Sequence, residues 1–405
     1  MENPKIRFKG YTKDWEQRKL GDMGSTFTGL SGKTKEDFGH GDAQFITYMN
    51  VFSNPVANLE MTEAVEIDAK QNRVKKGDVF FTTSSETPEE VGMSCVMPEN
   101  KDNIYLNSFC FGYRPTEKFD LDYLAYVLRA DSFRKEMKFL AQGISRYNIS
   151  KNKVMEVSIP IPNLEEQTMV GRYFSTLDHL ITLHQRKCEQ TKKLKKYMLQ
   201  KMFPQNGAKV PEIRFDGFTY DWEQRKLSEL LEKYEDPVET PHDGYERVGI
   251  RSHAKGTFHS FVEPGKELDT AKMYRVAADK FILNITFAWE HAVAITDNND
   301  AGKLVSHRFP QFSFNPKLKP HFFKYLMLDK KFREHLELSS PGGAGRNRVL
   351  KISDMLKYEI KLPSIEEQIK IGEYFDSLDH LITLHQRKCD ELKKMKKFML
   401  QNMFI

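Results

Sequence analysis

The stretch LDHLITLHQRKC occurs twice in this chain, from Leu177 to Cys188 and again from Leu378 to Cys389, without a single change. The similarity continues on both sides of this core, over residues 159–203 in the first copy and 360–404 in the second. A repeat of this length indicates a duplicated structural element, and the rest of the chain can be placed around it.

Each copy is predicted to be one long helix. Asn163 is followed three positions later by Glu166, and Ser364 by Glu367. A short polar residue and a carboxylate at this spacing can satisfy two free backbone donors at a helix start. The first helix should end near Pro204, because proline cannot continue a helix. At a rise of about 1.5 Å per residue, each helix would be roughly 60 Å long.

One face of each predicted helix follows the alternating spacing of three and four that is typical of a coiled coil. The alternative is a pair of unrelated amphipathic surface helices. We favour pairing, because the identity covers every face and two equivalent helices pack most simply about a pseudo-twofold axis. The expected seam includes Leu177, Ile181, His184, Cys188, Met198, Leu378, Ile382, His385, Cys389 and Met399.

Size and composition set broad limits. The chain has 405 residues, enough for two or three domains, and a net charge of +5 from 62 basic and 57 acidic residues. The positive charge is concentrated in the predicted helices, which indicates either a solvated face or a surface that meets phosphate or a partner. Four dispersed cysteines argue against a disulfide framework and a zinc site. No apolar run or signal peptide indicates a membrane, so a cytoplasmic protein is expected.

A second repeat shows that the whole chain is doubled. PKIRFKGYTKDWEQRKL begins at Pro4 and PEIRFDGFTYDWEQRKL at Pro211. Between each such motif and the following long helix lies a divergent segment with β-rich runs, among them AQFITYMNVF, and then a helical pattern, 121–141 in the first and 321–337 in the second. We predict an α+β fold with two pseudo-twofold-related domains, 1–158 and 205–359, joined by spacer helices 159–204 and 360–405 that form an antiparallel coiled coil.

The loops that close the two variable segments, the turn at residues 84–86 and two other polar loops within the segments are the candidates for contact with a ligand. Glycine lets a backbone approach closely, and Arg and Asn suit bases and phosphates; an ordinary surface loop is the alternative at every position. The candidates for DNA binding are Lys33, Lys35, Ser84, Ser85, Glu86, Arg146, Tyr147, Asn148, Arg251, Ser252, Lys255, Arg346, Asn347 and Arg348.

Sequence signals of catalysis are missing. Asn54-Pro55 and Asn315-Pro316 lack the second proline and aromatic residue of an amino-methyltransferase loop, and no GKS or GKT phosphate loop is present. His179 and His184 are five residues apart, which does not direct two imidazoles at one metal. We therefore expect no catalytic residues, no cofactor and no metal in this chain.

Two divergent domains on matching helices suggest a protein that reads two DNA half-sites at a fixed separation.

The chain resembles the specificity subunit of type I restriction-modification enzymes. The resemblance is carried by the repeated DWEQRKL motif, by KKGDVFFTTSSE (75–86) and by IPIPNLEEQ and KLPSIEEQ before the long helices. It implies two target-recognition domains that read a bipartite site in double-stranded DNA, helices that fix the spacer, and two modification (methyltransferase) subunits docked on them. Restriction subunits would add translocation and cleavage. Two alternatives are a protein scaffold that binds no nucleic acid and a methyltransferase with a diverged cofactor site.

Overall fold

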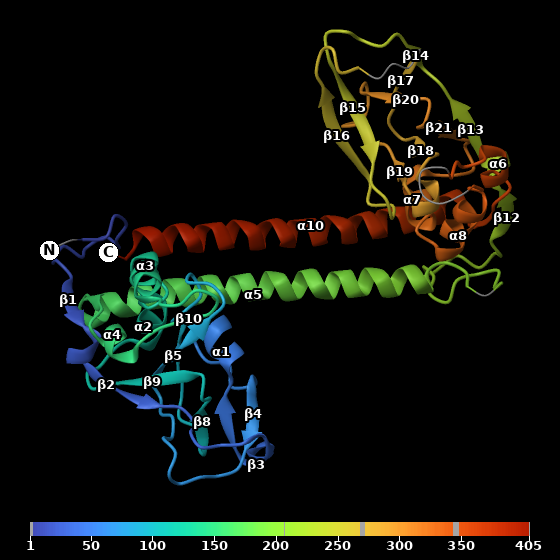
Figure 1. The fold of residues 1–405 in the computed structure, drawn as a ribbon. Coiled ribbons are helices and arrows are strands. Elements are labelled where there is room, and N and C mark those ends of the chain that lie inside the picture. Colours follow the sequence, from blue (N-terminus) through green and yellow to red (C-terminus); the bar gives the residue numbers. More distant parts are fainter. Residues whose placement is uncertain (1–2, 206, 268–271, 343–347, 405) are drawn as a thin grey trace. The chain divides into compact units, whose positions relative to one another are not determined.

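The computed structural model describes residues 3–205, 207–267, 272–342 and 348–404. The chain divides into two compact units, Met1–Arg186 with Gln386–Ile405, and Lys187–His385. Each unit therefore contains one variable segment and one part of each long helix. Mixed sheets and helices in both units confirm the predicted α+β class (Figure 1).

The two long helices are α5 (Leu164–Lys201) and α10 (Ile365–Asn402). The side chain of Asn163 accepts a hydrogen bond from the backbone of Glu166 at 2.9 Å, and that of Ser364 from Glu367 at 3.3 Å. The polar residue at each start thus acts as expected from the sequence. The two glutamate side chains, which are themselves buried, have a different partner, because each pairs with a half-buried arginine.

In each unit, this ion pair links the two kinds of repeated segment, the PKIRF or PEIRF motif and the start of the long helix. Arg7, from the first PKIRF motif, donates to both carboxylate oxygens of Glu166 at 2.6 and 2.9 Å. Arg214 makes the same bidentate contact with Glu367, at 2.7 Å for each bond. Both carboxylates are almost completely buried, so the arginines supply the charge that their burial requires.

Within each unit, segments of α5 and α10 run antiparallel (Figure 1). In the first unit, Phe174 stacks on Phe404 at a centroid distance of 5.5 Å, and four residues further along α5 Asp178 pairs with Lys396. In the second unit, Phe203 stacks on Phe375 at 6.0 Å. Of the expected seam residues, the buried ones are Leu177, Ile181, Cys188, Leu378 and Cys389, and the half-buried ones are His184, Met198, Ile382, His385 and Met399.

The described residues of the first unit form four small sheets. Their strand orders are β2-β9-β5-β7, β4-β3-β8, β1-β11 and β10-β6. The strands are β1 (Glu16–Lys19), β2 (Gly24–Thr28), β3 (Phe38–Ile46), β4 (Thr62–Val65), β5 (Val79–Thr82), β6 (Ser84–Ser85), β7 (Ser94–Val96), β8 (Ile104–Leu106), β9 (Cys110–Pro115), β10 (Tyr147–Asn148) and β11 (Ser158–Ile161).

The helices of this unit besides α5 and α10 are short. They are η1 (Leu20–Asp22), η2 (Lys35–Asp37), α1 (Tyr48–Ser53), α2 (Leu121–Val127), α3 (Asp131–Leu140) and α4 (Lys151–Met155). The main core joins the β2-β9-β5-β7 sheet to α2, α3 and α5, and the residues just after α10, Met403 and Phe404, contribute to it. Gly171 permits the close approach of α5 to α2, because a Cβ there would lie 2.5 Å from the Tyr123 nitrogen.

The second unit also combines small sheets with short helices. Its sheets have the orders β13-β21-β18-β19, β14-β17-β20-β15-β16 and β12-β22. The strands are β12 (Glu223–Lys226), β13 (Leu231–Tyr234), β14 (Pro237–Val238), β15 (Tyr245–Ile250), β16 (Thr257–Val262), β17 (Met273–Arg275), β18 (Phe281–Leu283), β19 (Val293–Ile295), β20 (Leu304–Ser306), β21 (Gln311–Phe314) and β22 (Glu359–Leu362). The short helices are α6 (Leu227–Leu230), η3 (Ala288–Glu290), α7 (Pro320–Leu326), α8 (Lys330–Leu338) and α9 (Ile352–Met355).

Three local predictions were wrong. The run AQFITYMNVF is not one strand, because Thr47 caps a helix, α1, that takes up its second half. The helical patterns at 121–141 and 321–337 are each broken in two, into α2 and α3 and into α7 and α8. The second helix of each pair buries its own aromatic residue, Phe133 or Phe332, against the sheet core, which one continuous helix would not permit.

Candidate nucleic-acid interface

Two polar loops that are distant in the sequence meet in the first unit. Strand β10 pairs antiparallel with β6, so that Tyr147 lies opposite Ser85 and Asn148 opposite Ser84. The turn after β5 and the closing loop of the variable segment are therefore one surface. Six of the candidate DNA-binding residues belong to it: Ser84, Ser85, Glu86, Arg146, Tyr147 and Asn148.

A cavity of about 410 Å³ opens on this surface. It is lined by Tyr48, Met49, Phe52, Ser84, Ser85, Glu86, Glu90, Ser145 and Arg146. The Tyr48 hydroxyl donates to the Ser84 carbonyl at 2.8 Å, and the Arg146 Nε donates to the Ser84 hydroxyl at 3.3 Å. Burial raises the pKa of Tyr48, so the hydroxyl keeps its proton and remains a donor. The cavity thus combines donors, acceptors and an aromatic wall.

The aromatic wall and Glu90 were not found from the sequence. Tyr48 and Phe52 stack with ring centroids 6.0 Å apart, one turn apart on α1. Tyr48 and Phe52 are four residues apart, which is a helical spacing, but they lie within AQFITYMNVF, a run that the sequence predicts to be β-rich. Glu90 accepts hydrogen bonds from Ser85 at 3.2 Å and Thr87 at 3.0 Å, a role that nothing in its sequence context indicated.

The loop that carries Lys33 and Lys35 is separately braced. Lys33 lies 3.2 Å from Asp68 and 3.8 Å from Asp37. Hydrogen bonds from the Lys70 backbone, from Gln71 and from Lys33 lower the pKa of Asp68 to about 2, which keeps this carboxylate charged. Lys33 is therefore engaged in holding its own loop, whereas Lys35, on η2, is exposed.

In the second unit, Arg251, Ser252 and Lys255 lie in a tight turn between β15 and β16. The Ser252 hydroxyl donates to Glu290 at 2.6 Å, and the Arg251 guanidinium lies 5.2 Å from the centroid of the Phe258 ring. These contacts orient both side chains, and Lys255 is exposed. A cavity of about 350 Å³ adjoins Ser252, Phe258 and Glu290.

The closing loop of the second unit is described up to Gly342 and from Arg348 onward. Arg346 and Asn347 lie outside the described residues. Arg348 donates from Nε to the Ser340 carbonyl at 3.2 Å, and its guanidinium lies 5.3 Å from the centroid of the Trp289 ring. The backbone beyond it repeats the first unit: the Leu350 nitrogen donates to Ile285 at 2.9 Å, as the Ile149 nitrogen donates to Thr83 at 3.0 Å.

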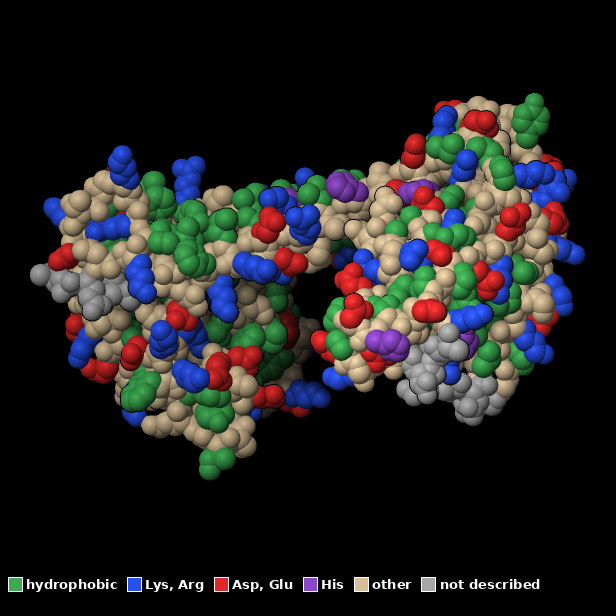
Figure 2. Space-filling view, turned by 90° about the horizontal axis from the view of Figure 1, so that it is seen from above, with side chains coloured by type: hydrophobic (Ala, Val, Ile, Leu, Met, Phe, Trp, Pro, Cys, Tyr) green, Lys and Arg blue, Asp and Glu red, His purple; other side chains and the backbone are tan. Residues whose placement is uncertain are grey.

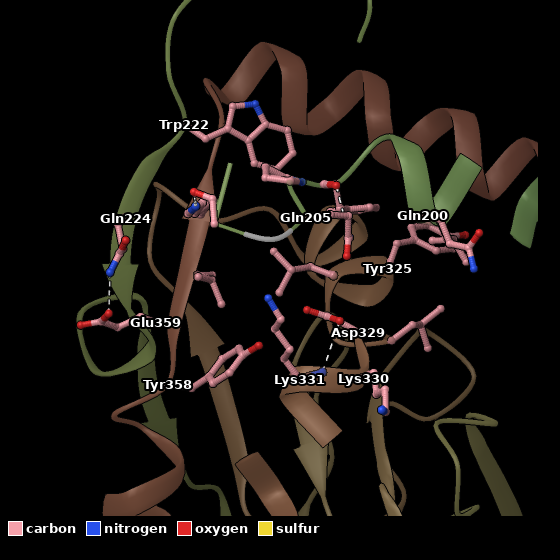
Figure 3. A pocket seen from close by; sticks show the side chains of 18 of the residues that line it. Gln200, Gln205, Trp222, Gln224, Tyr325, Asp329, Lys330, Lys331, Tyr358 and Glu359 are labelled. Atoms are coloured by element: carbon pink, nitrogen blue, oxygen red, sulfur yellow. Dashed lines mark hydrogen bonds between the residues drawn. The ribbon is translucent and has the colours of Figure 1, made fainter. Parts of the chain in front are cut away.

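A larger cavity, about 600 Å³, lies beside the end of α5 in the second unit. Figure 3 shows Lys331 and Asp329 facing it from the start of α8, with Trp222 on the opposite side. Gln224 donates to Glu359 at 2.5 Å along one edge. Trp222 and Gln224 belong to the repeated DWEQRKL motif, and the cavity shares no residue with the candidate DNA-binding set.

The described ranges contain no group of three or more His, Cys, Asp and Glu side chains placed to hold a metal ion. In the same ranges, no helix has both the length and the apolar character needed to cross a bilayer.

Comparisons with known proteins agree with one another. The family described as type I restriction modification DNA specificity domain matches residues 12–193 and 220–394. The chain is 27% identical, over 95% of its length, to a protein assigned as the MjaX type I restriction enzyme specificity subunit of Methanocaldococcus jannaschii, and covers 91% of it. It is 26% identical over 68% of its length to the MjaVIII specificity subunit of the same organism, covering 67% of that protein.

Solved structures show the same fold. The crystal structure of a type I restriction-modification system S subunit from M. genitalium superposes with a TM-score of 0.61 at 14% identity. The alignment covers 100% of this chain and 99% of that one. At this identity the likeness concerns the fold alone.

Proposed function

Because the chain belongs to the family of type I restriction-modification DNA specificity subunits, which supply recognition and not catalysis, we propose that its two units each read one half of a bipartite site in double-stranded DNA. The reading domains would be 1–158 and 205–359, and the spacer helices 159–204 and 360–405. A DNA partner would also place the protein in the cytoplasm.

The observation that carries this proposal is the shared surface of β6 and β10. There Arg146 is exposed, and its guanidinium donates to the Ser84 hydroxyl. Hydroxyl groups of Ser84 and Ser85 and the carboxylate of Glu86 lie at the same cavity. A guanidinium suits guanine or phosphate, and a carboxylate can accept from the cytosine amino group. The surface therefore has the mixture of groups that reads base edges.

The spacing would be set by the long helices. Each is 38 residues long, which corresponds to about 57 Å of helix. Half-sites separated by one turn of DNA are roughly 34 Å apart, within this length. In each unit the two helical segments are tied by a lysine–aspartate pair, Lys396 with Asp178 and Lys195 with Asp379. Paired helices resist bending better than one, and we propose that they fix the distance between the readers.

The same helices would bind two modification subunits. Exposed hydrophobic residues recur at equivalent positions of the two copies: Leu194 and Tyr197 on α5 correspond to Met395 and Phe398 on α10. On the face drawn in Figure 2, hydrophobic side chains lie among basic and acidic ones. Exposed apolar groups bordered by charge are typical of protein interfaces. Restriction subunits would join the same complex.

Footprinting of the reconstituted complex on DNA tests the proposal. The expected result is two protected segments separated by an unprotected or weakly protected spacer. One continuous short footprint would contradict the bipartite reading, and no protection would favour a scaffold that binds no DNA. For docking, Tyr197→Ser and Phe398→Ser should each remove one modification subunit, as measured by the mass of the complex. Full occupancy in both variants would reject this surface.

A further inference from the structure

The side chain of Ile144 is 97% exposed, the highest value among the large hydrophobic side chains in the described part of the chain. It lies in the loop Gly143–Tyr147, next in sequence to Ser145 and Arg146, which line the cavity of about 410 Å³. A single exposed apolar residue is ordinary on a protein surface. This one differs because its backbone is held in a closed and specific conformation.

The loop is the tip of a small hairpin. The Gln142 nitrogen donates to Asn148 at 2.9 Å, and the Asn148 nitrogen donates back to Gln142 at 2.8 Å. Gly143 has a φ of +146°, and a Cβ at this position would lie 2.0 Å from the Arg146 carbonyl oxygen, so the turn depends on glycine. Beyond the hairpin, Ile149 is buried and bonded to Thr83. Ile144 thus lies at the tip of a hairpin that backbone hydrogen bonds close at its base.

The surroundings of Ile144 fit DNA better than a protein partner. The next two residues, Ser145 and Arg146, line the cavity, and Arg146 has its guanidinium at the Ser84 hydroxyl. Ile144 and the exposed Met49, which lines the same cavity, together offer too little area for a stable protein interface. A single apolar side chain flanked by a cation is, however, sufficient to enter a base step, because the cation meets phosphate while the hydrocarbon replaces stacking.

We propose that Ile144 acts as a wedge that inserts between two base pairs of the half-site read by the first unit. The cavity beside it gives room for the edge of a base that has lost its stacking neighbour. Since unstacking costs less at flexible steps, the wedge would add sequence preference at a step that no side chain needs to read by hydrogen bonding. This inference rests on the proposed function and specifies how one of the two units recognises DNA.

The test uses the full chain, purified with the subunits that accompany it, and a duplex that this complex selects from a random-sequence pool. 2-Aminopurine is placed in turn at each position of the half-site read by the first unit. The wild type should give a several-fold rise in fluorescence at one step. Ile144→Ala should abolish that rise and weaken binding by about tenfold, whereas Ile144→Met should retain both.

A mismatch placed at the same step provides the decisive control, because it supplies the unstacking in advance. It should restore the affinity of Ile144→Ala to within about twofold of the wild type. Leu338→Ala, which alters an exposed residue of the second unit, should leave the fluorescence at this step unchanged. Equal fluorescence and affinity for wild type and Ile144→Ala would overturn the wedge while leaving DNA reading intact. A wild-type complex that selects no duplex would overturn the proposed function and the wedge together.

Discussion

The Lys396 ammonium lies 2.6 Å from Oδ1 and 2.7 Å from Oδ2 of the Asp178 carboxylate, which joins α10 to α5 within the first unit. Tyr126, from α2, donates to the same carboxylate at 2.8 Å. The second unit repeats the junction with Lys195 and Asp379 at 2.5 Å, and with Tyr325 at 2.8 Å from Asp379. Each junction therefore connects both long helices to the variable segment of its unit.

The first prediction concerns the strength of this junction. Asp178→Asn and Lys396→Met, combined in a double-mutant cycle, should show a coupling energy of about 1 kcal/mol, because both side chains are partly exposed. The measurement is urea unfolding of the wild type, both single variants and the double variant. Lys397→Met, an exposed neighbour, should change stability by less than about 0.5 kcal/mol. Additive effects of the two substitutions would contradict a direct interaction.

The ion pair between Arg7 and the buried Glu166 should contribute more to stability than the pair between Lys396 and Asp178. Arg7→Met leaves Glu166 buried without its partner, and we expect a loss of roughly 3–5 kcal/mol in the free energy of unfolding. Arg18→Met, which breaks the exposed pair with Glu117, is the matched control and should cost less than about 1 kcal/mol. Urea unfolding followed by circular dichroism distinguishes the two. Equal losses would show that burial of Glu166 is not what makes its pair important.

His291 should make the second unit sensitive to pH. It is buried, has a left-handed φ of 62°, and its Nε2 donates to the Met327 carbonyl at 2.9 Å. Burial lowers the pKa of His291 below its ordinary value of 6.5. The unfolded chain therefore takes up the proton first, so the stability of the folded state should fall as the pH drops below about 6.5.

The check is urea unfolding at several values between about pH 5 and 8. His291→Asn should flatten the dependence, since asparagine tolerates the left-handed conformation and does not titrate. His242→Asn, at an exposed histidine, should leave the slope as in the wild type. An unchanged slope in His291→Asn would assign the pH dependence to another group.

Arg146→Ala should weaken binding to the half-site of the first unit by about tenfold and reduce the salt slope by about one if the guanidinium meets phosphate. Binding at the other half-site should not change. The measurement is a titration of DNA at several salt concentrations with each half-site scrambled in turn. Lys19→Ala serves as the charge-matched control, because Lys19 pairs with Glu156 away from this cavity. Equal losses in both variants would indicate a non-specific effect of charge.

The repeated parts of the molecule were the easiest to predict. The fold class, the two long helices and their starts follow from duplication, because an element that occurs twice carries the same capping residue twice, as Asn163 and Ser364 show. The role of Glu166 was not visible, since its partner Arg7 lies far away in the sequence and only tertiary packing brings them together.

The variable segments were less predictable. The sequence marked Ser84 and Arg146 separately, but the pairing of β6 with β10 that joins them depends on long-range contacts. Helix α1 was not predicted, because Tyr48 and Phe52 have high strand propensity. In the structure, the cap that Thr47 provides at the helix start outweighs this propensity. The exposure of the Ile144 side chain could not be predicted, because the exposure of a single residue has no sequence signature.

The central claim is that two separable readers recognise two halves of one site. It is tested most directly by mapping DNA methylation in cells before and after residues 228–359 are exchanged for the corresponding segment of another such chain. The account predicts that one half of the methylated motif changes while the other half and the spacer length stay the same. A motif that changes in both halves, or in neither, would contradict it.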